Sequence, residues 1–351
     1  MTTQKKLIFG LDSFGDIPTT AEGQLFTQAA AIRQVVAEGG VLADQLGLDV
    51  IALGEHHRPE YAISSPETVL AGIATQTKNI ILASGVTVLS SDDPVRVYER
   101  FATLDALSNG RAEVVLGRGS FTESFPLYGY NLEDYDLLFE EKVALFAKLK
   151  TEKPVSWSGK TRAPLKETAI YPQTEKGSLA TRIAVGGTPE SVVRAAKYGF
   201  PLTLAIIGGT PQRFVPYIKF YQKAAAKFSQ PAYPIAVHSH GLIADTDEEA
   251  FELGWRHLRK SFVRIGRDRG WVPMSRAQFE NEVKSGSFYV GSPETVAQRL
   301  AEMIRTLGVG RVELAYGAGE LSAPARMHMI ELYAKEVIPR VRKLLSEGSE
   351  K

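Results

Sequence analysis

The sequence predicts an α/β fold in which eight parallel strands, each followed by a helix, close into a (β/α)8 barrel. Two observations support this prediction. Short apolar runs alternate with longer segments of helical periodicity along the 351 residues. The runs are apolar at successive positions, as expected for parallel strands that helices cover. Since no linker marks a second domain, we expect residues 1–351 to form one domain with insertions.

Eight stretches fit the expected strands. In chain order they are KLIFGLD (6–12), DVIALGE (49–55), IILASGVTVL (80–89), AEVVLGRG (112–119), RIAVGG (182–187), LTLAIIGG (202–209), IAVHSHGLIA (235–244) and RVELAYG (311–317). A barrel of this kind builds its active site at the carboxyl ends of its strands. Polar residues and glycines at the ends of these stretches are therefore the first candidates for a functional site.

A recurring signature marks the expected helix starts. SPETV occurs at 65–69 and 292–296, and TPESV occurs at 188–192. A hydroxyl residue takes the N-cap position, and proline follows at the first helical position, where the N–H has no intrahelical partner anyway. The glutamate next to it suits the positive end of the helix dipole. DDPVR (92–96) and GTPQR (209–213) are variants of the same signature.

Two stretches interrupt the alternation. Residues 151–180 are polar, and we expect an insertion with short strands there. Residues 259–291 combine arginine, glycine and aromatic residues without a clean period, so we expect a long mobile loop. Because this loop follows the seventh strand, it is a candidate lid over the barrel mouth.

The composition excludes several functional classes. The 41 basic and 40 acidic residues give a net charge of +1, which provides no general attraction for nucleic acid or anionic membranes. There is no cysteine, which excludes disulfides, thiolate nucleophiles and cysteine-ligated zinc. The first apolar run is too short for a signal peptide, and no window approaches about 18 to 20 apolar residues. We expect a soluble, cytoplasmic protein.

Histidines stand at the end of the second expected strand and within the seventh. His56 and His57 follow Glu55, and each can act as a general base, ligate a metal or hydrogen-bond within a turn. Adjacent residues on a strand point to opposite faces, so we expect at most one of the two to face the site directly. His238 and His240 share a face because they are two residues apart. Together with His56 they suit a metal-dependent hydrolase, which is one alternative.

Two glycine-rich turns are candidate anion sites. In LGRGS (116–120), glycine lets the backbone approach a ligand and Arg118 can pair with a phosphate. A tight turn with a surface arginine is the alternative. In VGGTPESV (185–192), a Gly-Gly turn leads into a helix N-terminus, which favours phosphate, although a simple capped turn explains the pattern as well. The GK[ST] of a Walker loop is missing.

Four segments, in this order, resemble the bacterial luciferase-like flavin-dependent monooxygenases over nearly the whole chain. They are GEHHRPEYAISSPETVLAGIA, NIILASGVTVLSSDDPVRVYERFATLDALSNGRAEVVLGRGS, IAVGGTPESVVRAAKYG, and RVELAYGAGE with the following ELYAKEVIPRV. The resemblance implies a TIM barrel with an insertion, commonly a homodimer. It implies binding of reduced FMN, or in some branches of the deazaflavin F420. The expected reaction oxidises a small organic substrate with O2, and a separate flavin reductase often supplies the reduced flavin.

The resemblance also implies roles for residues. His56 resembles the catalytic base or acid near the flavin. Gly85 and Val86 match a bulge of strand three, often a non-prolyl cis peptide, that backs the flavin ring. Arg118 resembles the arginine that contacts the FMN phosphate. The phosphate-binding turn is matched by Gly187 and Thr188.

Other positions carry weaker expectations. Gly117 stands where bacterial luciferase has a reactive cysteine, so light emission is not implied. We expect possible substrate or lid contacts from His57, His238, Arg264 and Arg267, and we expect no metal. Three alternatives stay open: F420-dependent hydride transfer without O2, the metal-dependent hydrolase, and a flavin-binding subunit without catalytic activity.

Overall fold

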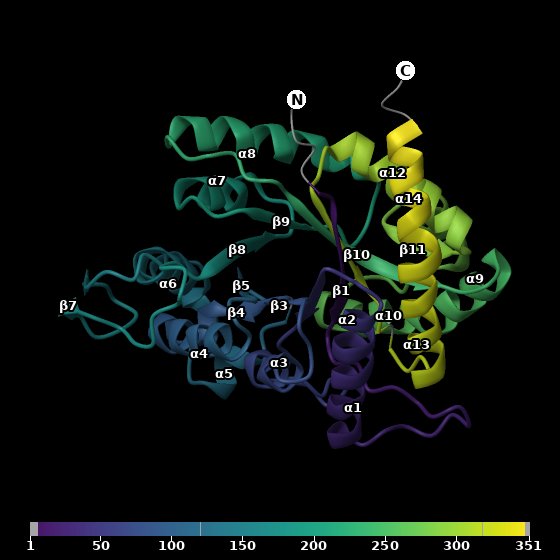
Figure 1. Ribbon diagram of the computed structural model, residues 1–351, viewed down its shortest axis with the longest axis horizontal. Helices are drawn as coiled ribbons and strands as arrows, with labels where there is room; N and C mark the ends of the chain where they lie inside the picture. The colour runs from purple at the N-terminus through teal and green to yellow at the C-terminus, as the bar shows by residue number, and fades with distance from the viewer. Residues whose placement is uncertain (1–5, 120, 318, 348–351) are drawn as a thin grey trace.

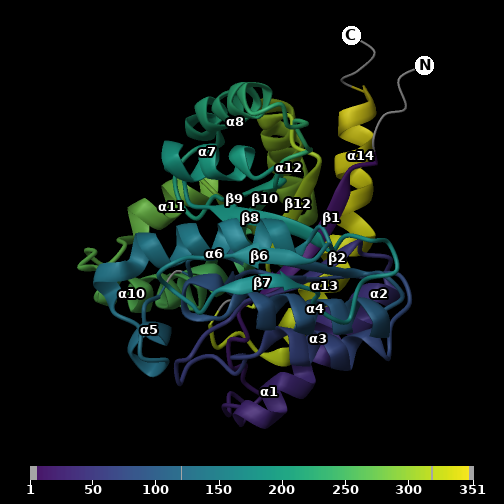
Figure 2. The ribbon, with the colours of Figure 1, turned by 90° about the vertical axis from the view of Figure 1, so that its left-hand side faces the viewer.

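The computed structural model describes residues 6–119, 121–317 and 319–347. Ser120 of the LGRGS stretch and Ala318 after the eighth expected strand therefore lie outside the described residues, as does the side chain of Arg269 in the expected lid. Figures 1 and 2 show strands enclosed by a ring of helices.

Eight parallel strands form a closed barrel. They are β1 (Ile8–Ser13), β2 (Val50–Leu53), β3 (Ile81–Ser84), β5 (Ala112–Gly117), β8 (Ala180–Val185), β9 (Leu202–Ala205), β10 (Ala236–Ile243) and β12 (Arg311–Ala315). Each strand pairs with the next in this order, and β12 pairs with β1 to close the ring. The predicted fold and its eight strands are confirmed.

Helices follow the strands and cover the outside of the barrel (Figure 2). They are α1 (Gln28–Val35), the π-helical turn η1 (Val36–Leu42), α2 (Ala43–Gln45), α3 (Pro66–Ala74), η2 (Leu89–Ser91), α4 (Pro94–Leu107), α5 (Ser124–Leu127), η3 (Leu132–Asp134), α6 (Tyr135–Leu149), α7 (Pro189–Lys197), η4 (Pro211–Phe214), α8 (Val215–Lys227), α9 (Asp247–Arg256), α12 (Pro293–Leu307), α13 (Ala323–Leu332), the π-helical turn η5 (Tyr333–Val337) and α14 (Ile338–Glu347). None of the helices in the described ranges is both long enough and apolar enough to cross a membrane.

The predicted helix starts are confirmed, because α3, α4, α7 and α12 each begin at the proline of the signature. GTPQR opens the 3-10 turn η4, which continues directly into the long helix α8. At the start of α12, the Ser292 hydroxyl accepts a hydrogen bond from the Thr295 N–H. Thr188 does not cap α7 in this way, since its hydroxyl donates to Ser191 Oγ at 2.8 Å.

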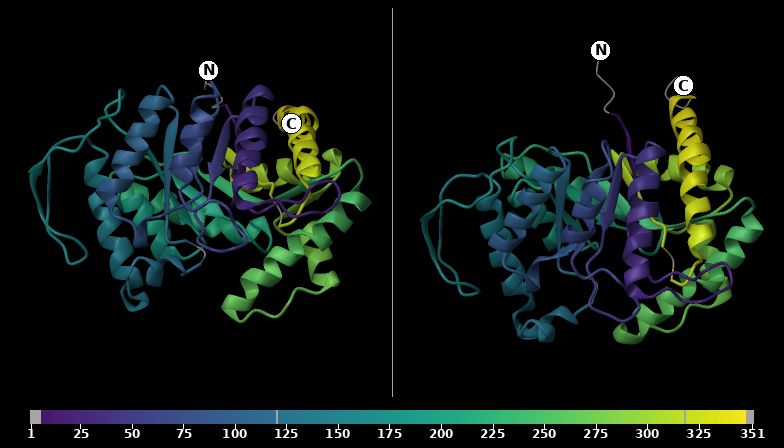
Figure 3. Two further views of the ribbon diagram at one scale, coloured as in Figure 1. Left: turned by 90° about the horizontal axis from the view of Figure 1, so that it is seen from below. Right: turned by 60° about the horizontal axis from the view of Figure 1, so that its bottom comes forward.

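The polar insertion at 151–180 contains a small antiparallel hairpin, as predicted. Its strands are β6 (Val155–Trp157) and β7 (Leu165–Thr168), which pair with each other and form a sheet separate from the barrel. Figure 3 shows this segment projecting from one side of the molecule.

The prediction of a long loop at 259–291 was wrong. The segment forms α10 (Leu258–Arg269), α11 (Arg276–Lys284) and β11 (Phe288–Gly291), and β11 pairs with the carboxyl-terminal half of β10. Phe262, Phe279 and Phe288 belong to a separate apolar cluster outside the main core. Because these rings pack together beside the barrel, the segment folds into two helices and a strand. Its mixed composition shows no helical or strand period that would have predicted them. Its role as a lid stays a prediction.

The strands alternate between two apolar environments. Ile51 and Leu53 of β2 belong to the main core beneath the helices, whereas Val50 and Ala52 belong to a small cluster with Val115 of β5. Val115 lines the cavity described below, so the small cluster lies inside the barrel. The inside is therefore narrow and partly apolar below the cavity.

Candidate active site

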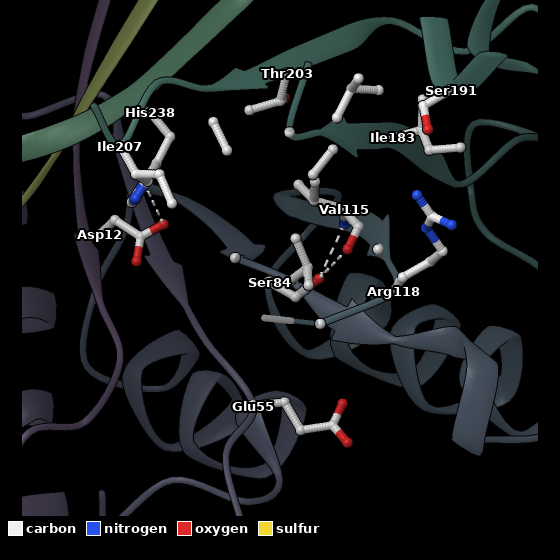
Figure 4. A pocket seen from close by; sticks show the side chains of 18 of the residues that line it. Asp12, Glu55, Ser84, Val115, Arg118, Ile183, Ser191, Thr203, Ile207 and His238 are labelled. Carbon is white, nitrogen blue, oxygen red and sulfur yellow. Dashed lines mark hydrogen bonds and ion pairs between the residues drawn. The ribbon is translucent and has the colours of Figure 1, made fainter. Parts of the chain in front are cut away.

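A cavity of about 300 Å³ lies at the carboxyl ends of the barrel strands (Figure 4). Residues from all eight barrel strands or the loops that follow them line it. Its size is at the lower end of the range for small-molecule sites. This is the position that the sequence predicted for an active site in a barrel.

Two arginines and a helix start form one end of the cavity, called here the basic end. Arg118 follows β5, Ser191 lies in the first turn of α7, and Arg194 is one turn further along α7. The Arg194 guanidinium lies 3.5 Å from Ser191 Oγ, and Arg118 donates to the exposed Asp136 at 2.9 Å. Two guanidinium groups beside the N–H groups of a helix start favour an anion such as a phosphate.

The Gly-Gly turn lies at the basic end, but only one of its two glycines lines the cavity. Gly186 lines the cavity, and a Cβ added there would meet nothing within 4 Å. Gly187 has a φ of 108°, which favours glycine. Gly187 and Thr188 are not among the lining residues, whereas Ser191 and Arg194 are. Sequence reasoning missed these last two, although their spacing from Thr188 along a helix start was a usable signal.

A break in the barrel wall lies between β3 and β5. The pairing of the two strands stops here and resumes at β4 (Thr87–Val88). The Ser84 hydroxyl fills the gap, because it accepts from the Val115 N–H at 2.9 Å and donates to the Val115 carbonyl at 3.3 Å. Sequence reasoning had not singled out Ser84.

Gly85 and Val86 follow this break and line the cavity. The peptide bond between them is cis, as the resemblance implied. A Cβ on Gly85 would come within 2.4 Å of Asp12 Oδ2, so only glycine fits against the neighbouring carboxylate. The result is a stretch of bare backbone that forms one wall of the cavity.

His56 lines the cavity within an aromatic surround. Its ring stacks on Tyr61 with centroids 4.4 Å apart, and it contacts Phe14 and Phe121 edge-on. Burial lowers the pKa of His56 to about 3, with smaller contributions from the nearby His57 and Arg58. The imidazole is therefore neutral at physiological pH.

His57 does not line the cavity. Its Nε2 lies 3.1 Å from Glu55 Oε1, and its ring packs edge-on against Tyr128. Glu55 lines the cavity and accepts a hydrogen bond from the Val88 N–H at 2.8 Å. Of the two histidines, His56 is among the residues that line the cavity and His57 is not. His57 holds Glu55 in place, and it lies outside the set of residues that a substrate in the cavity would touch.

Asp12 and His238 lie at the opposite end of the cavity from Arg118 (Figure 4). We call this end the acid–base end. His238 Nδ1 is 3.1 Å from Asp12 Oδ2. Burial raises the pKa of Asp12, and the nearby His238 offsets this only in part. Burial alone would lower the pKa of His238, but Asp12 and, more weakly, Glu313 outweigh it and raise that pKa.

The three histidines of the hydrolase alternative do not form a ligand group within the described residues. The ring of Phe14 instead packs against His56, His238 and His240, at centroid distances of 5.5, 5.6 and 6.1 Å. A trio that does come together is Asp12, His238 and Glu313, whose ligand atoms lie within 4.8 Å of one another. Its Glu313 carboxylate already binds the buried guanidinium of Arg311, which disfavours a cation there.

The two lid arginines lie on α10, outside the cavity lining. Arg264 Nε is 3.9 Å from Glu60 Oε1 in the loop after β2, and Arg267 is exposed. Phe262, also on α10, packs edge-on against His240 of β10 with centroids 4.9 Å apart. α10 therefore contacts the loop after β2 and the strand β10 at the barrel mouth. Neither arginine lines the cavity.

The fold and the site together define a class: closed (β/α)8 barrels with a cavity at the carboxyl ends of the strands that has a basic end and a buried acid–base end. The sequence assigns the chain more narrowly. Residues 17–311 match the model of the luciferase-like monooxygenase family. The chain belongs to that family.

Two curated relatives span most of this chain. The alkanal monooxygenase alpha chain of Photobacterium leiognathi is 23% identical over 332 residues, which are 86% of this chain and 92% of the relative. The limonene 1,2-monooxygenase of Rhodococcus erythropolis is 27% identical over 312 residues, 84% of this chain and 78% of the relative.

Solved structures share the fold. Monooxygenase RslO1 from Streptomyces bottropensis has a TM-score of 0.81 at 22% identity and covers 95% of this chain and 99% of its own. The oxygenating constituent of 3,6-diketocamphane monooxygenase from Pseudomonas putida, in complex with FMN, has a TM-score of 0.76 at 21% identity, with coverage of 95% and 99%. An F420-dependent secondary alcohol dehydrogenase, in complex with an F420-acetone adduct, has a TM-score of 0.74 at 18% identity, with coverage of 96% and 99%.

Proposed function

We propose that the protein is a flavin-dependent monooxygenase that uses reduced FMN and O2 to oxidise a small organic substrate. The observation that supports this most is the joint presence, in one cavity, of an anion-binding end and a bare backbone wall. Arg118, Arg194 and Ser191 would hold the phosphate, and the backbone at Gly85 and Val86 would lie along the ring system. The bound reduced flavin supplies the electrons for oxygen activation.

His56 is the proposed catalytic residue. Its imidazole is neutral at pH 7, so it can donate its own N–H in a hydrogen bond to a substrate or to the cofactor, and its lowered pKa makes it a weaker base than an ordinary histidine. The surrounding rings of Phe14, Tyr61 and Phe121 exclude water from it. Water exclusion protects a reactive oxidant and strengthens polar interactions inside the cavity.

Reconstitution tests this proposal. The purified protein is mixed with reduced FMN without oxygen, and substrate-dependent O2 consumption is then measured with alkanals, limonene and bicyclic ketones, which the names of the relatives suggest. His56→Gln should slow turnover by about 100-fold or more while the Kd for reduced FMN changes little. His328→Gln, at an exposed histidine far from the cavity lining, is the control. Binding of neither FMN nor F420 in any redox state would disprove the proposal.

F420 is a second candidate cofactor, because a protein of the same fold holds an F420-acetone adduct. Separate absorbance titrations with FMN and F420 distinguish the two. A flavin-binding subunit without catalytic activity would bind FMN and consume no O2 above background with any substrate.

We also propose a cytoplasmic homodimer that receives reduced flavin from a separate reductase. Sedimentation velocity tests the dimer, and fractionation of the source cells tests the location. The need for a separate reductase is tested with NADH or NADPH as the electron source. Turnover should then require an added flavin reductase.

A further inference from the structure

The acid–base end of the cavity holds two buried titratable side chains that the proposed reaction does not use. His238 and Asp12 are 7% and 2% exposed, and both line the cavity. Figure 4 shows the two side chains facing each other at the end remote from Arg118. A ligand that places its phosphate at the basic end extends toward this pair.

The other titratable groups near His238 either offset one another or stay uncharged at neutral pH. The Asp12/His238 pair is therefore the unit whose charge changes with pH at this end of the cavity. Asp12 faces His238 from β1, and Glu313 faces it from β12. On β12, Arg311 binds both Glu313 and the Glu113 carboxylate of β5. Arg182 of β8 also interacts with both carboxylates, so two cationic and two anionic groups offset one another.

Two further neighbours complete the surroundings of His238. On its own strand, burial and the nearby His238 lower the pKa of His240 to about 3, so His240 is uncharged at neutral pH. On β9, the neighbouring positions are Thr203 and Ala205, which carry no charge.

The charge of this pair depends on pH in a defined direction. The pKa of His238 is raised by its carboxylate neighbours, so the imidazolium form persists to a higher pH than in an ordinary histidine. While one proton is shared, the pair is neutral overall and offers a cationic ring to the cavity. Once pH exceeds the raised pKa, the pair keeps only the carboxylate charge, which repels an anion.

We propose that the Asp12/His238 pair selects the charge of the ring system bound beside it, so that the cavity binds reduced FMN in preference to oxidised FMN. A fully reduced isoalloxazine ionises near neutral pH and becomes an anion, whereas the oxidised ring is uncharged there. An imidazolium nearby favours the anion, in the way that charge near the ring tunes a flavin. This inference rests on the proposed function and assigns His238 and Asp12 as positioning residues for cofactor selection.

The first part of the test uses the protein without cofactor. NMR of the histidine rings should give His238 a pKa above that of a free histidine, and Asp12→Asn should lower it. A pKa of His238 at or below the ordinary value would overturn the inference, whether or not flavin binds.

The second part compares the Kd values of reduced and oxidised FMN between pH 6 and pH 9. The preference for reduced FMN should be at least about tenfold near neutral pH, where the reduced ring is ionised and His238 still carries its proton, since an opposite charge nearby shifts an ionisation by one unit or more. It should decline toward pH 9 as His238 loses that proton, and toward pH 6 as the reduced ring becomes neutral. His238→Gln, Asp12→Asn and the double variant should each abolish the preference to the same extent. His240→Gln, at the uncharged histidine on the same face of β10, should keep it.

The outcomes separate the two proposals. Equal Kd values for the two redox forms, or a preference that survives His238→Gln, would overturn this inference and leave the proposed function standing. Failure of both redox forms to bind would overturn both.

Discussion

Replacing Arg118 with glutamine should weaken FMN binding through the phosphate alone. Arg118 lies at the basic end, where its guanidinium packs over the ring of Tyr135 at 5.0 Å. Its hydrogen-bond partner Asp136 has a side chain that is 84% exposed. Because an exposed ion pair contributes little to stability, the substitution should leave the fold intact.

The expected magnitude follows from the interaction that is lost. A hydrogen bond to a charged group contributes about 1.5 to 3 kcal/mol. Arg118→Gln should therefore raise the Kd for FMN by about 10-fold to 150-fold. Arg194 is a less suitable target, because it also binds Glu140 at 2.5 Å and its loss would free that carboxylate.

The assay compares FMN with riboflavin, which has the same ring system and no phosphate. Fluorescence titration should show the loss for FMN and an unchanged Kd for riboflavin. Arg96→Gln, at an exposed arginine on α4, is the matched control and should change neither value. An equal loss for both ligands, or no loss for FMN, would refute the assignment of the basic end to the phosphate.

Two further substitutions test the supports of the site. Ser84→Ala removes both hydrogen bonds to the Val115 backbone and should lower the free energy of unfolding by about 1 to 3 kcal/mol in urea denaturation, whereas Ser346→Ala should have no effect. Burial, only partly offset by arginines, raises the pKa of Asp16 to about 7, so the folded protein keeps a proton that the unfolded chain releases near pH 4. The free energy of unfolding should therefore fall as pH rises from about 4 to 7. Above pH 7, Asp16→Asn should be more stable than the wild type by on the order of 1 to 3 kcal/mol.

Each of these two predictions has an outcome that would contradict it. For Ser84, it is an unchanged urea midpoint in the alanine variant, which would mean that the hydroxyl does not bridge the break in the wall. For Asp16, it is a stability difference between variant and wild type that stays the same from pH 5 to pH 8.

The local patterns predicted most of the fold. Apolar runs gave the eight strands, because strands buried on both faces must be apolar throughout. The Ser-Pro-Glu and Thr-Pro-Glu signatures gave the helix starts, since capping depends on a few adjacent residues. The segment with α10, α11 and β11 was missed because Phe262, Phe279 and Phe288 meet only in three dimensions, in their own cluster.

The site was predicted in part for the same reason. His56, Arg118 and the glycines belong to local motifs, and each lies in or beside the cavity. The contact of Asp12 with His238 could not be read from the sequence. It requires β1 and β10 to flank β12, where His238 is in register with Glu313 and Asp12 with Ala315, two residues further along. A pairing of this kind depends on barrel closure, which leaves no signal in either segment.

A crystal structure with bound FMN tests the central claim most directly. Our account predicts the phosphate between Arg118, Ser191 and the start of α7, and the isoalloxazine ring along the backbone of Gly85 and Val86, with its far end toward His238. Density for FMN elsewhere on the protein, or a phosphate remote from Arg118, would contradict it.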